Sequence, residues 1–103
     1  MKGLGNMVKQ AQQLQSKMAA LQEELGHRKV EASSGGGMVS VAVNGKQELL
    51  SLTIEPDILK EEDRELIQDL VLAAVNEGLN RSREMVQQEM AKLTGGLSIP
   101  GLM

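Results

Sequence analysis

An apolar side chain recurs at every third or fourth position near the start of the chain. The recurring residues are Met7, Ala11, Leu14, Met18, Leu21 and Leu25. Spacings that alternate between three and four are those of a heptad seam, which an α-helix presents as one narrow stripe. At about 1.5 Å per residue such a helix is roughly 30 Å long, which is too long for the core of so small a chain to cover. We therefore predict a helix over residues 1–26 that pairs with one other helix and projects into solvent.

Aliphatic side chains alone must build the core, because the chain contains no Phe, Tyr or Trp. Aromatic residues bury the most surface each, so we expect a second subunit to supply the missing burial. The chain also has no cysteine, which excludes disulfides and thiolate metal sites. No apolar run approaches the roughly 18 residues of a membrane span, and the first residues lack the apolar core of a signal peptide. We expect a soluble cytoplasmic protein.

Residues 28–55 carry the pattern of a three-stranded antiparallel sheet with one buried face. Valines alternate with small residues before Asn44-Gly45, and leucine or isoleucine alternates with serine or threonine after it. Alternation of this kind is strand periodicity, and Asn-Gly is the strongest short hairpin signal because both residues tolerate positive φ. A two-residue turn pairs Val41 with Glu48 and places the apolar side chains of both strands on one face.

A long helix is predicted over residues 62–93, after a short turn at residues 57–60. The first half of this helix has a wide apolar face, which we expect to lie on the sheet. Apolar positions are sparser in its second half, which is expected to leave the sheet and pair with the first helix. Residues 94–103 are expected to form a C-terminal tail, for which the sequence predicts no regular structure. The expected fold is therefore α+β, in a single domain over residues 1–103.

Features that could belong to an enzyme have simpler interpretations. Three glycines at residues 35–37 could cradle a phosphate, but such a loop precedes a helix, and these lie between two expected strands, where a turn is the usual role. The acidic run at residues 61–65 suits a helix N-terminus, and nothing nearby completes a metal site. His27 is the only histidine and has no partner for nucleophilic catalysis. We expect no enzymatic activity, no metal and no cofactor.

Basic side chains are unevenly distributed in a chain of net charge −3. Residues 1–29 hold five basic and two acidic side chains, whereas residues 55–69 hold two basic and seven acidic ones. Phosphate oxygens accept hydrogen bonds from Lys, Arg and Gln, but these residues equally suit a solvated surface with helical ion pairs. Without aromatic residues to stack on bases, a nucleic-acid partner would be a duplex held by its backbone. The candidate contacts are Lys9, Lys17, Arg81, Arg83 and Lys92.

Three segments in this order resemble the YbaB/EbfC family of bacterial nucleoid-associated proteins. They read GNMVKQAQQLQSKMAALQEEL, GGGMVSVAVNGKQELLSLTIEPDIL and EDRELIQDLVLAAVNEGLNRSREMVQQEMAKLTGGLSIPG. The resemblance extends from Gly5 to Gly101. Within it, Asn76 interrupts the apolar face of the long helix, either to bond a neighbour or to contact a ligand. Gly78 stands where the family usually has alanine, and a mid-helix glycine costs about 1 kcal/mol relative to alanine, so we expect a bend or a close helix crossing there.

The resemblance implies a tweezer-like homodimer whose sheets and long helices join at the centre and whose paired helical arms project. It implies binding to duplex DNA through the arms, and a role in nucleoid organisation, gene regulation, or recombination and repair, with recombination proteins as further partners. No small-molecule substrate, membrane or enzymatic activity is implied. The basic positions named above would be the DNA contacts, and the weakly acidic net charge implies weak, salt-sensitive affinity.

A coiled-coil interaction protein is the alternative function. In this hypothesis the chain is an adaptor or holdase that holds another protein between its arms. The glutamine-rich, methionine-lined first helix fits it, because methionine surfaces adapt to varied partners. Loss of a protein client on mutation of Met7 and Met18, with DNA affinity retained, would favour this alternative.

Overall fold

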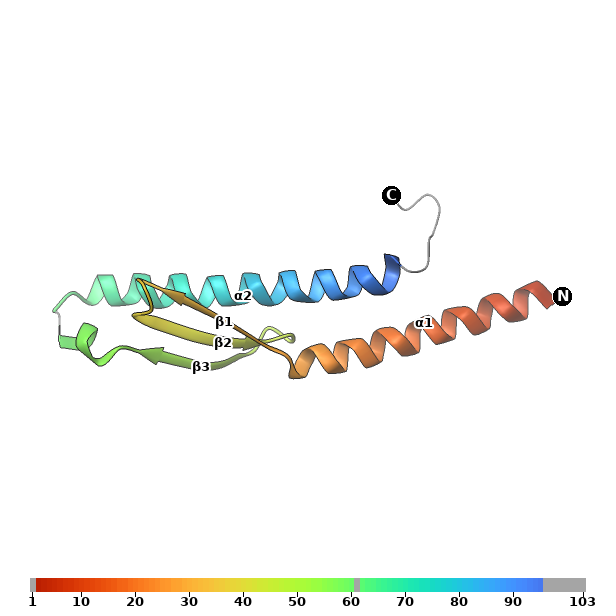
Figure 1. Ribbon diagram of the computed structural model, residues 1–103, viewed down its shortest axis with the longest axis horizontal. Coiled ribbons are helices and arrows are strands. Elements are labelled where there is room, and N and C mark those ends of the chain that lie inside the picture. Colours follow the sequence, from red (N-terminus) through yellow and green to blue (C-terminus); the bar gives the residue numbers. More distant parts are fainter. Residues whose placement is uncertain (1, 61, 96–103) are drawn as a thin grey trace.

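A computed structural model describes residues 2–60 and 62–95 of the chain. The elements are α1 (Lys2–His27), β1 (Lys29–Ser34), β2 (Val39–Asn44), β3 (Leu49–Ile54), the 3-10 helix η1 (Pro56–Lys60) and α2 (Arg64–Gly95). The predicted α+β order of helix, three strands and long helix is confirmed. The first two residues of the expected tail continue α2, and residues 96–103 lie outside the described residues. The molecule is elongated, and both long helices extend beyond the sheet on the same side (Figure 1).

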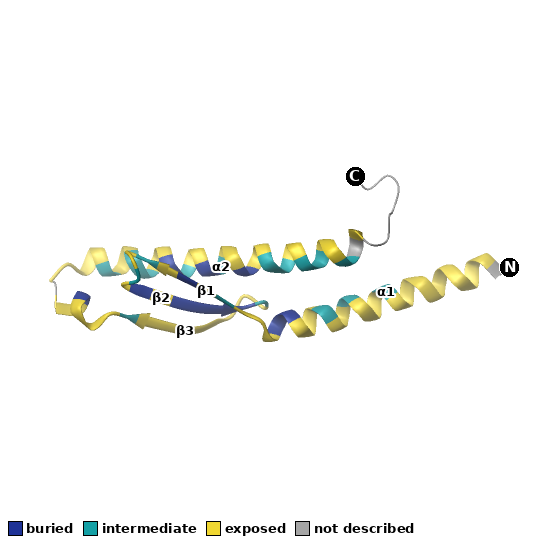
Figure 2. Ribbon diagram, in the orientation of Figure 1, coloured by how far each residue is buried: buried dark blue, intermediate teal, exposed yellow. Residues whose placement is uncertain are grey.

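The core lies between α2 and the central strand. The sheet is antiparallel in the order β1-β2-β3, and α2 crosses β1 and β2 on one face. Val39, Val41 and Val43 point toward α2 and are almost fully buried, together with Ala32 of β1 and Ala74 of α2. These residues form the buried band across β2 and the adjoining face of α2 (Figure 2). Because no side chain in it is aromatic, the core is thin and depends on close approach of the backbones.

The turn between β2 and β3 is longer than predicted. Val41 lies opposite Leu52, not Glu48, and a bulge shifts the register between Ala42 and Val43. The side chain of Asn44 explains the difference, because its Oδ1 accepts backbone N–H bonds from Lys46 at 2.9 Å and Glu48 at 3.0 Å. This side chain stabilises a wider loop than a two-residue turn allows. The partner of Val41 is thus four residues further along the chain than predicted. Because four is an even number, the apolar side chains paired with Val39 and Val41 keep their predicted face.

The three glycines form the turn between β1 and β2, as predicted. Gly35, Gly36 and Gly37 have φ values of 59°, 67° and 98°, which is the left-handed region that only glycine enters without strain. The N–H of Gly37 donates to the carbonyl of Ser34 at 3.2 Å and closes the turn. No helix follows, so the segment has the geometry of a turn and not of a phosphate loop.

Among the described residues, no helix covers the part of the sheet that β3 forms. Helix α2 lies over β1 and β2, and β3 extends beyond it. Leu49, Leu50 and Leu52 of β3 are 45%, 53% and 39% exposed. Further large apolar side chains are exposed in the adjoining elements, namely Met38, Leu59, Leu66 and Leu72. The three leucines of β3 are close together on one strand, and clustered exposed apolar side chains are typical of interaction surfaces.

Polar contacts join α2 to the turn of the β2–β3 hairpin. Ser82 is fully buried, and its hydroxyl donates to the backbone carbonyl of Asn44 at 2.6 Å. The side-chain amide of Gln47 donates to the same hydroxyl at 2.6 Å. Asn76, six residues earlier, is exposed and does not interrupt the packed face as expected from the sequence. The polar residue that does enter this face is Ser82, whose hydroxyl is itself satisfied by the carbonyl of Asn44. That carbonyl also accepts the backbone N–H of Gln47 at 3.2 Å.

Gly78 lies where α2 packs closely against the central strand. A Cβ at this position would lie 2.8 Å from Cγ2 of Val41 and 2.9 Å from Cγ2 of Val43. Of the two expectations for this glycine, close packing is the one observed, although the neighbour is a strand and not a helix. The cost of glycine in the helix is therefore offset by contact between α2 and the central valines.

We predict that Gly78→Ala destabilises the fold even though alanine is the better helix former. The propensity gain of about 1 kcal/mol is opposed by overpacking that typically costs about 1–3 kcal/mol. A thermal melt followed by circular dichroism should show a lower Tm. Gly5→Ala is the matched control, because Gly5 lies in α1 with open space around it and should not lower Tm. A higher Tm for Gly78→Ala would contradict the close packing.

Candidate nucleic-acid interface

Helix α1 is attached to the body of the molecule at its last turn. Leu25 is 1% exposed, and its carbonyl accepts N–H bonds from Arg28 at 3.1 Å and from Gly45 at 3.0 Å. A Cβ on Gly45 would overlap that carbonyl, so glycine is required where the hairpin turn meets α1. The direction of α1 is therefore set by the β2–β3 turn, which Ser82 in turn joins to α2.

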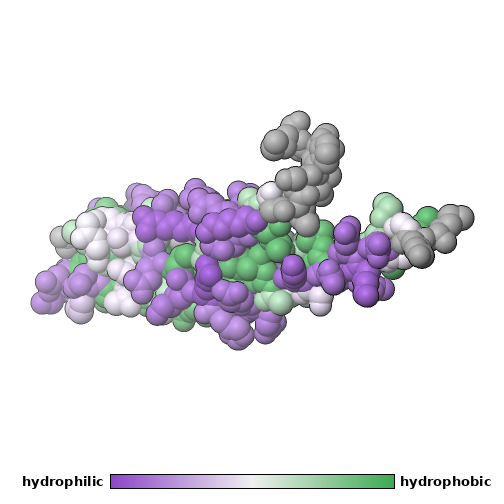
Figure 3. All heavy atoms as spheres, turned by 45° about the vertical axis from the view of Figure 1, so that its right-hand side comes forward, coloured by the Kyte–Doolittle hydropathy of each residue, from purple (hydrophilic) through white to green (hydrophobic). Residues whose placement is uncertain are grey.

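The apolar stripe of α1 faces α2 only along part of its length. Leu14, Met18 and Leu21 are half-buried, whereas Leu4 and Met7 are 63% and 68% exposed. Figure 3 shows apolar surface near the middle of the molecule, bordered by hydrophilic side chains. The seam predicted from the heptad spacing is thus paired near the body and free toward the beginning of α1. The exposed half is an arm that projects from the rest of the chain (Figure 1).

The five basic residues predicted as contacts divide into two groups. Lys9 and Lys17 are exposed on α1 and have no polar partner within residues 2–60 and 62–95. The three on α2 all have partners. Arg81 donates to Glu77 at 3.1 Å and to the backbone carbonyl of Glu31 at 2.8 Å. Arg83 donates to Asn80 at 2.9 Å, and Lys92 to Glu89 at 3.2 Å.

Helix α1 also carries polar residues that the sequence analysis did not select. Asn6 and Gln13 lie between and beside the two lysines at spacings of three and four, so Asn6, Lys9, Gln13 and Lys17 follow one side of the helix. All four side chains can donate hydrogen bonds to phosphate, and each is exposed. The helical spacing alone could have identified Asn6 and Gln13, because no structural information is needed to place them on this side.

The two arms differ in their local charge. No acidic residue precedes Glu23, so residues 2–22 carry three lysines and no carboxylate. The part of α2 over residues 77–95 carries three basic and three acidic side chains. An anion therefore meets a positive field along α1 and a balanced one along α2.

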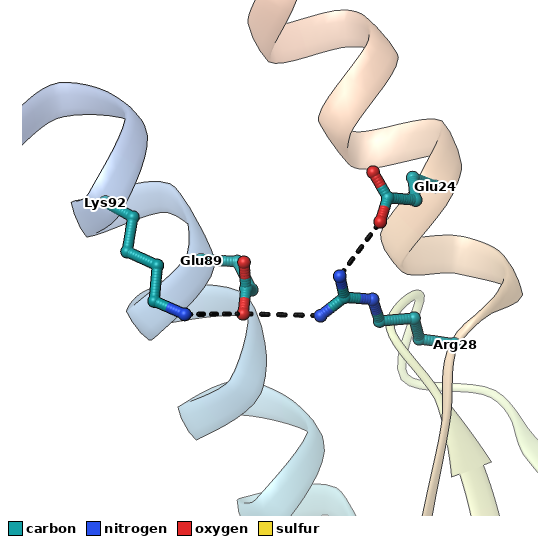
Figure 4. A network of polar contacts seen from close by, with 4 residues as sticks. All are labelled: Glu24, Arg28, Glu89 and Lys92. Carbon is teal, nitrogen blue, oxygen red and sulfur yellow. Dashed lines mark hydrogen bonds and ion pairs between the residues drawn. The ribbon is translucent and has the colours of Figure 1, made fainter. Parts of the chain in front are cut away.

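Four charged side chains connect the bases of the two arms (Figure 4). Arg28, between α1 and β1, donates to Glu24 at 2.9 Å and forms an ion pair with Glu89 of α2 at 3.3 Å. Glu89 also pairs with Lys92 at 3.2 Å. The hydrogen bond to Glu24 and the charge of Glu89 raise the pKa of Arg28. The hydrogen bond from Lys92 lowers the pKa of Glu89, with further contributions from Arg28 that oppose its desolvation.

The described residues form no catalytic, metal or membrane site at the other candidates considered from the sequence. His27 is exposed, with its Nε2 at 3.3 Å from Glu23, which agrees with a solvent-facing helix end. In the described part of the chain, no cluster of three or more His, Cys, Asp or Glu side chains could hold a metal ion. Neither long helix contains, among its described residues, an apolar window able to cross a bilayer.

The geometry is that of a small body with a positively charged helical arm, and comparison with known proteins assigns its family. A model of the YbaB/EbfC DNA-binding family matches residues 1–97. The chain belongs to this family. The resemblance seen in the three sequence segments is thereby confirmed.

Relatives of this YbaB/EbfC family member cover nearly its whole length. A nucleoid-associated protein of Thermoanaerobacter pseudethanolicus is 54% identical over 99 residues, which are 96% of this chain and 89% of the relative. A nucleoid-associated protein of Syntrophobacter fumaroxidans is 56% identical over 97 residues, with 94% and 88% covered. A nucleoid-associated protein of Moorella thermoacetica is 56% identical over 102 residues, with 96% and 98% covered.

A solved structure supports the fold independently. The crystal structure of an uncharacterized protein from Helicobacter pylori superposes with a TM-score of 0.72 at 30% sequence identity. The match covers 88% of this chain and 92% of that protein. The arrangement of two long helices and a three-stranded sheet is therefore shared with another chain of quite different sequence.

Proposed function

We propose that this protein binds duplex DNA and that α1 supplies the main contacts. The observation that carries the proposal is the state of Lys9 and Lys17, which are exposed and have no partner among the described residues, on a helix without acidic residues before Glu23. The family match and the names of the relatives support a nucleoid-associated DNA-binding role. Within the bacterial cytoplasm such a protein would lie on the nucleoid.

Contacts from this face would go to the phosphate backbone. Lysine, asparagine and glutamine side chains bond phosphate oxygens whatever the base sequence, and no aromatic side chain is present to stack on a base. Binding should therefore have low sequence specificity and depend steeply on salt. Roles in nucleoid organisation, gene regulation, or recombination and repair, with recombination proteins as further partners, fit such a mode. We assign the chain no enzymatic activity.

The three basic residues of α2 are proposed as secondary contacts. Arg81, Arg83 and Lys92 each have an intramolecular partner, and Glu77 and Glu89 neutralise two of the three charges locally. A phosphate must displace or share these partners, so each residue should contribute less than a free lysine.

Replacing Lys9 and Lys17 together with alanine should weaken duplex binding at every sequence tested. Loss of two phosphate contacts makes the slope of log K against log salt less steep by roughly 0.9 per contact. Fluorescence anisotropy of a labelled duplex, titrated at several salt concentrations, measures both the affinity and the slope. The triple variant Arg81→Ala, Arg83→Ala, Lys92→Ala should show a smaller loss.

Lysines outside the proposed face provide the control. Lys60→Ala removes one positive charge from η1, where Lys60 pairs with Asp57 at 3.6 Å, and should leave the slope unchanged. If the Lys9 and Lys17 variant binds as the unmodified protein does, α1 is not the DNA contact. If the α2 triple variant also binds normally, the arms as a whole are wrongly assigned.

We further propose that the protein acts as a homodimer through the uncovered face of β3. Leu49, Leu50 and Leu52 are too exposed for the side chains of a strand that remains monomeric. The missing aromatic residues point the same way, because one chain alone buries little apolar surface. A second copy would bury these leucines and place two basic α1 arms on one particle, which increases avidity for DNA.

Replacing Leu50 and Leu52 together with glutamate should convert the dimer into monomers. Charged groups at a buried apolar interface are strongly unfavourable. Size-exclusion chromatography with light scattering gives the mass directly. Leu4→Glu is the matched control, since Leu4 is exposed at the far end of α1 and should leave the dimer intact. A dimer that persists with both glutamates in β3 would place the interface elsewhere.

A protein clamp is the second candidate function, and the exposed half of the α1 stripe is the observation that favours it. Leu4, Met7 and Val8 are 63%, 68% and 51% exposed, which suits adaptable contact with an apolar segment of another protein.

Replacing Met7 and Met18 with serine separates the two functions. If a client binds between the arms, this variant should lose it in a pull-down from lysate but should retain duplex binding by anisotropy. A pull-down with the unmodified protein that recovers no specific partner counts against the clamp.

A further inference from the structure

One carboxylate oxygen at the base of the arms receives two cations from different parts of the fold. Oε1 of Glu89 lies 3.2 Å from Nζ of Lys92 and 3.3 Å from Nη1 of Arg28. An oxygen placed between a guanidinium and an ammonium group has the surroundings that a phosphate oxygen has on a nucleic-acid-binding protein. The site thus has the chemistry of a phosphate subsite that is already filled by a side chain of the protein (Figure 4).

The three groups differ in access to solvent. The side chain of Glu89 is 21% exposed, whereas those of Arg28 and Lys92 are 43% and 73% exposed. The two cations can therefore be reached from outside while the carboxylate between them is the more covered group. Glu24 also pairs with Arg28, but through the other guanidinium nitrogen, so it does not occupy the position between Arg28 and Lys92.

We propose that Glu89 acts as an internal substitute for a DNA phosphate, and that a phosphate of the duplex replaces it at Arg28 and Lys92. The inference rests on the proposed DNA-binding function and adds Arg28 to its contacts. In the free protein the carboxylate keeps the two cations paired and joins the arm bases. On binding, the phosphate takes up the hydrogen bonds of both cations, and the Glu89 carboxylate turns toward solvent.

The energetic cost of this exchange is small. Ion pairs as exposed as these contribute little to stability, because water and salt screen them. The phosphate would gain two charge-assisted contacts and release condensed counterions from the DNA. Glu89 thereby competes with the phosphate at this point without blocking it, and it makes the affinity lower than the count of basic residues suggests.

Glu89→Gln tests the proposal, because it removes the charge and keeps the shape. Without the competing carboxylate, Arg28 and Lys92 should raise the affinity for a labelled duplex by roughly tenfold at 0.1 M salt. The slope of log K against log salt should change little, because the same phosphates are contacted. Glu84→Gln is the matched control. Glu84 is exposed on the same helix and pairs with no cation within the described ranges, so it reports the effect of one lost negative charge alone.

A second substitution identifies the cation involved. Arg28→Ala should reduce the magnitude of the slope by roughly 0.9 in the unmodified protein and in the Glu89→Gln background alike, because the phosphate contacts Arg28 in both. In the Glu89→Gln background it should also remove about half of the gain in affinity. If the unmodified protein binds the duplex but Glu89→Gln and Glu84→Gln behave alike, the phosphate-substitute role is wrong and the DNA-binding function stands. If neither the unmodified protein nor any variant binds, the proposed function itself fails.

Discussion

Gly78 lets α2 lie closer to the valines of β2 than any residue with a Cβ would allow. This contact determines the rest of the molecule, because a core without aromatic side chains must gain its burial from close backbones. The buried hydroxyl of Ser82 then fixes the hairpin turn to α2. That turn receives the last turn of α1 through Gly45 and Leu25. The direction of the arm thus follows from a chain of contacts that begins at one glycine.

Helix α1 projects from the body because it is attached only near its last turn. Only the part of α1 near Leu25 is buried, and the heptad stripe continues beyond the reach of α2 with Leu4 and Met7 exposed. Loose packing of this kind would be unfavourable in a protein whose only task is to be stable. It suits a protein that must present a long, charged helix to a ligand larger than itself. The leucines of β3 are exposed in the same way, which is the basis of the dimer proposed above.

The two long helices differ in how their basic side chains are paired. Lys9 and Lys17 of α1 have no polar partner within residues 2–60 and 62–95, whereas Arg81 and Lys92 of α2 are paired with Glu77 and Glu89. An overall charge of −3 is therefore compatible with a local positive field on one helix. Glu89, with its lowered pKa, keeps its negative charge and its two partners under ordinary conditions.

The sequence by itself determined the order of elements, the buried face of β2 and the basic side of α1, because apolar and charged periodicities are local properties of a helix or strand. Several features were decided only by the tertiary structure. Asn44 was predicted to begin a two-residue turn, but its side chain stabilises a longer loop. Gly78 packs against Val41 and Val43, and Arg28 pairs with Glu89. Both contacts join residues that are far apart in the chain. No local pattern encodes such contacts, since they arise only when the packing of α2 on the sheet brings the two arms together.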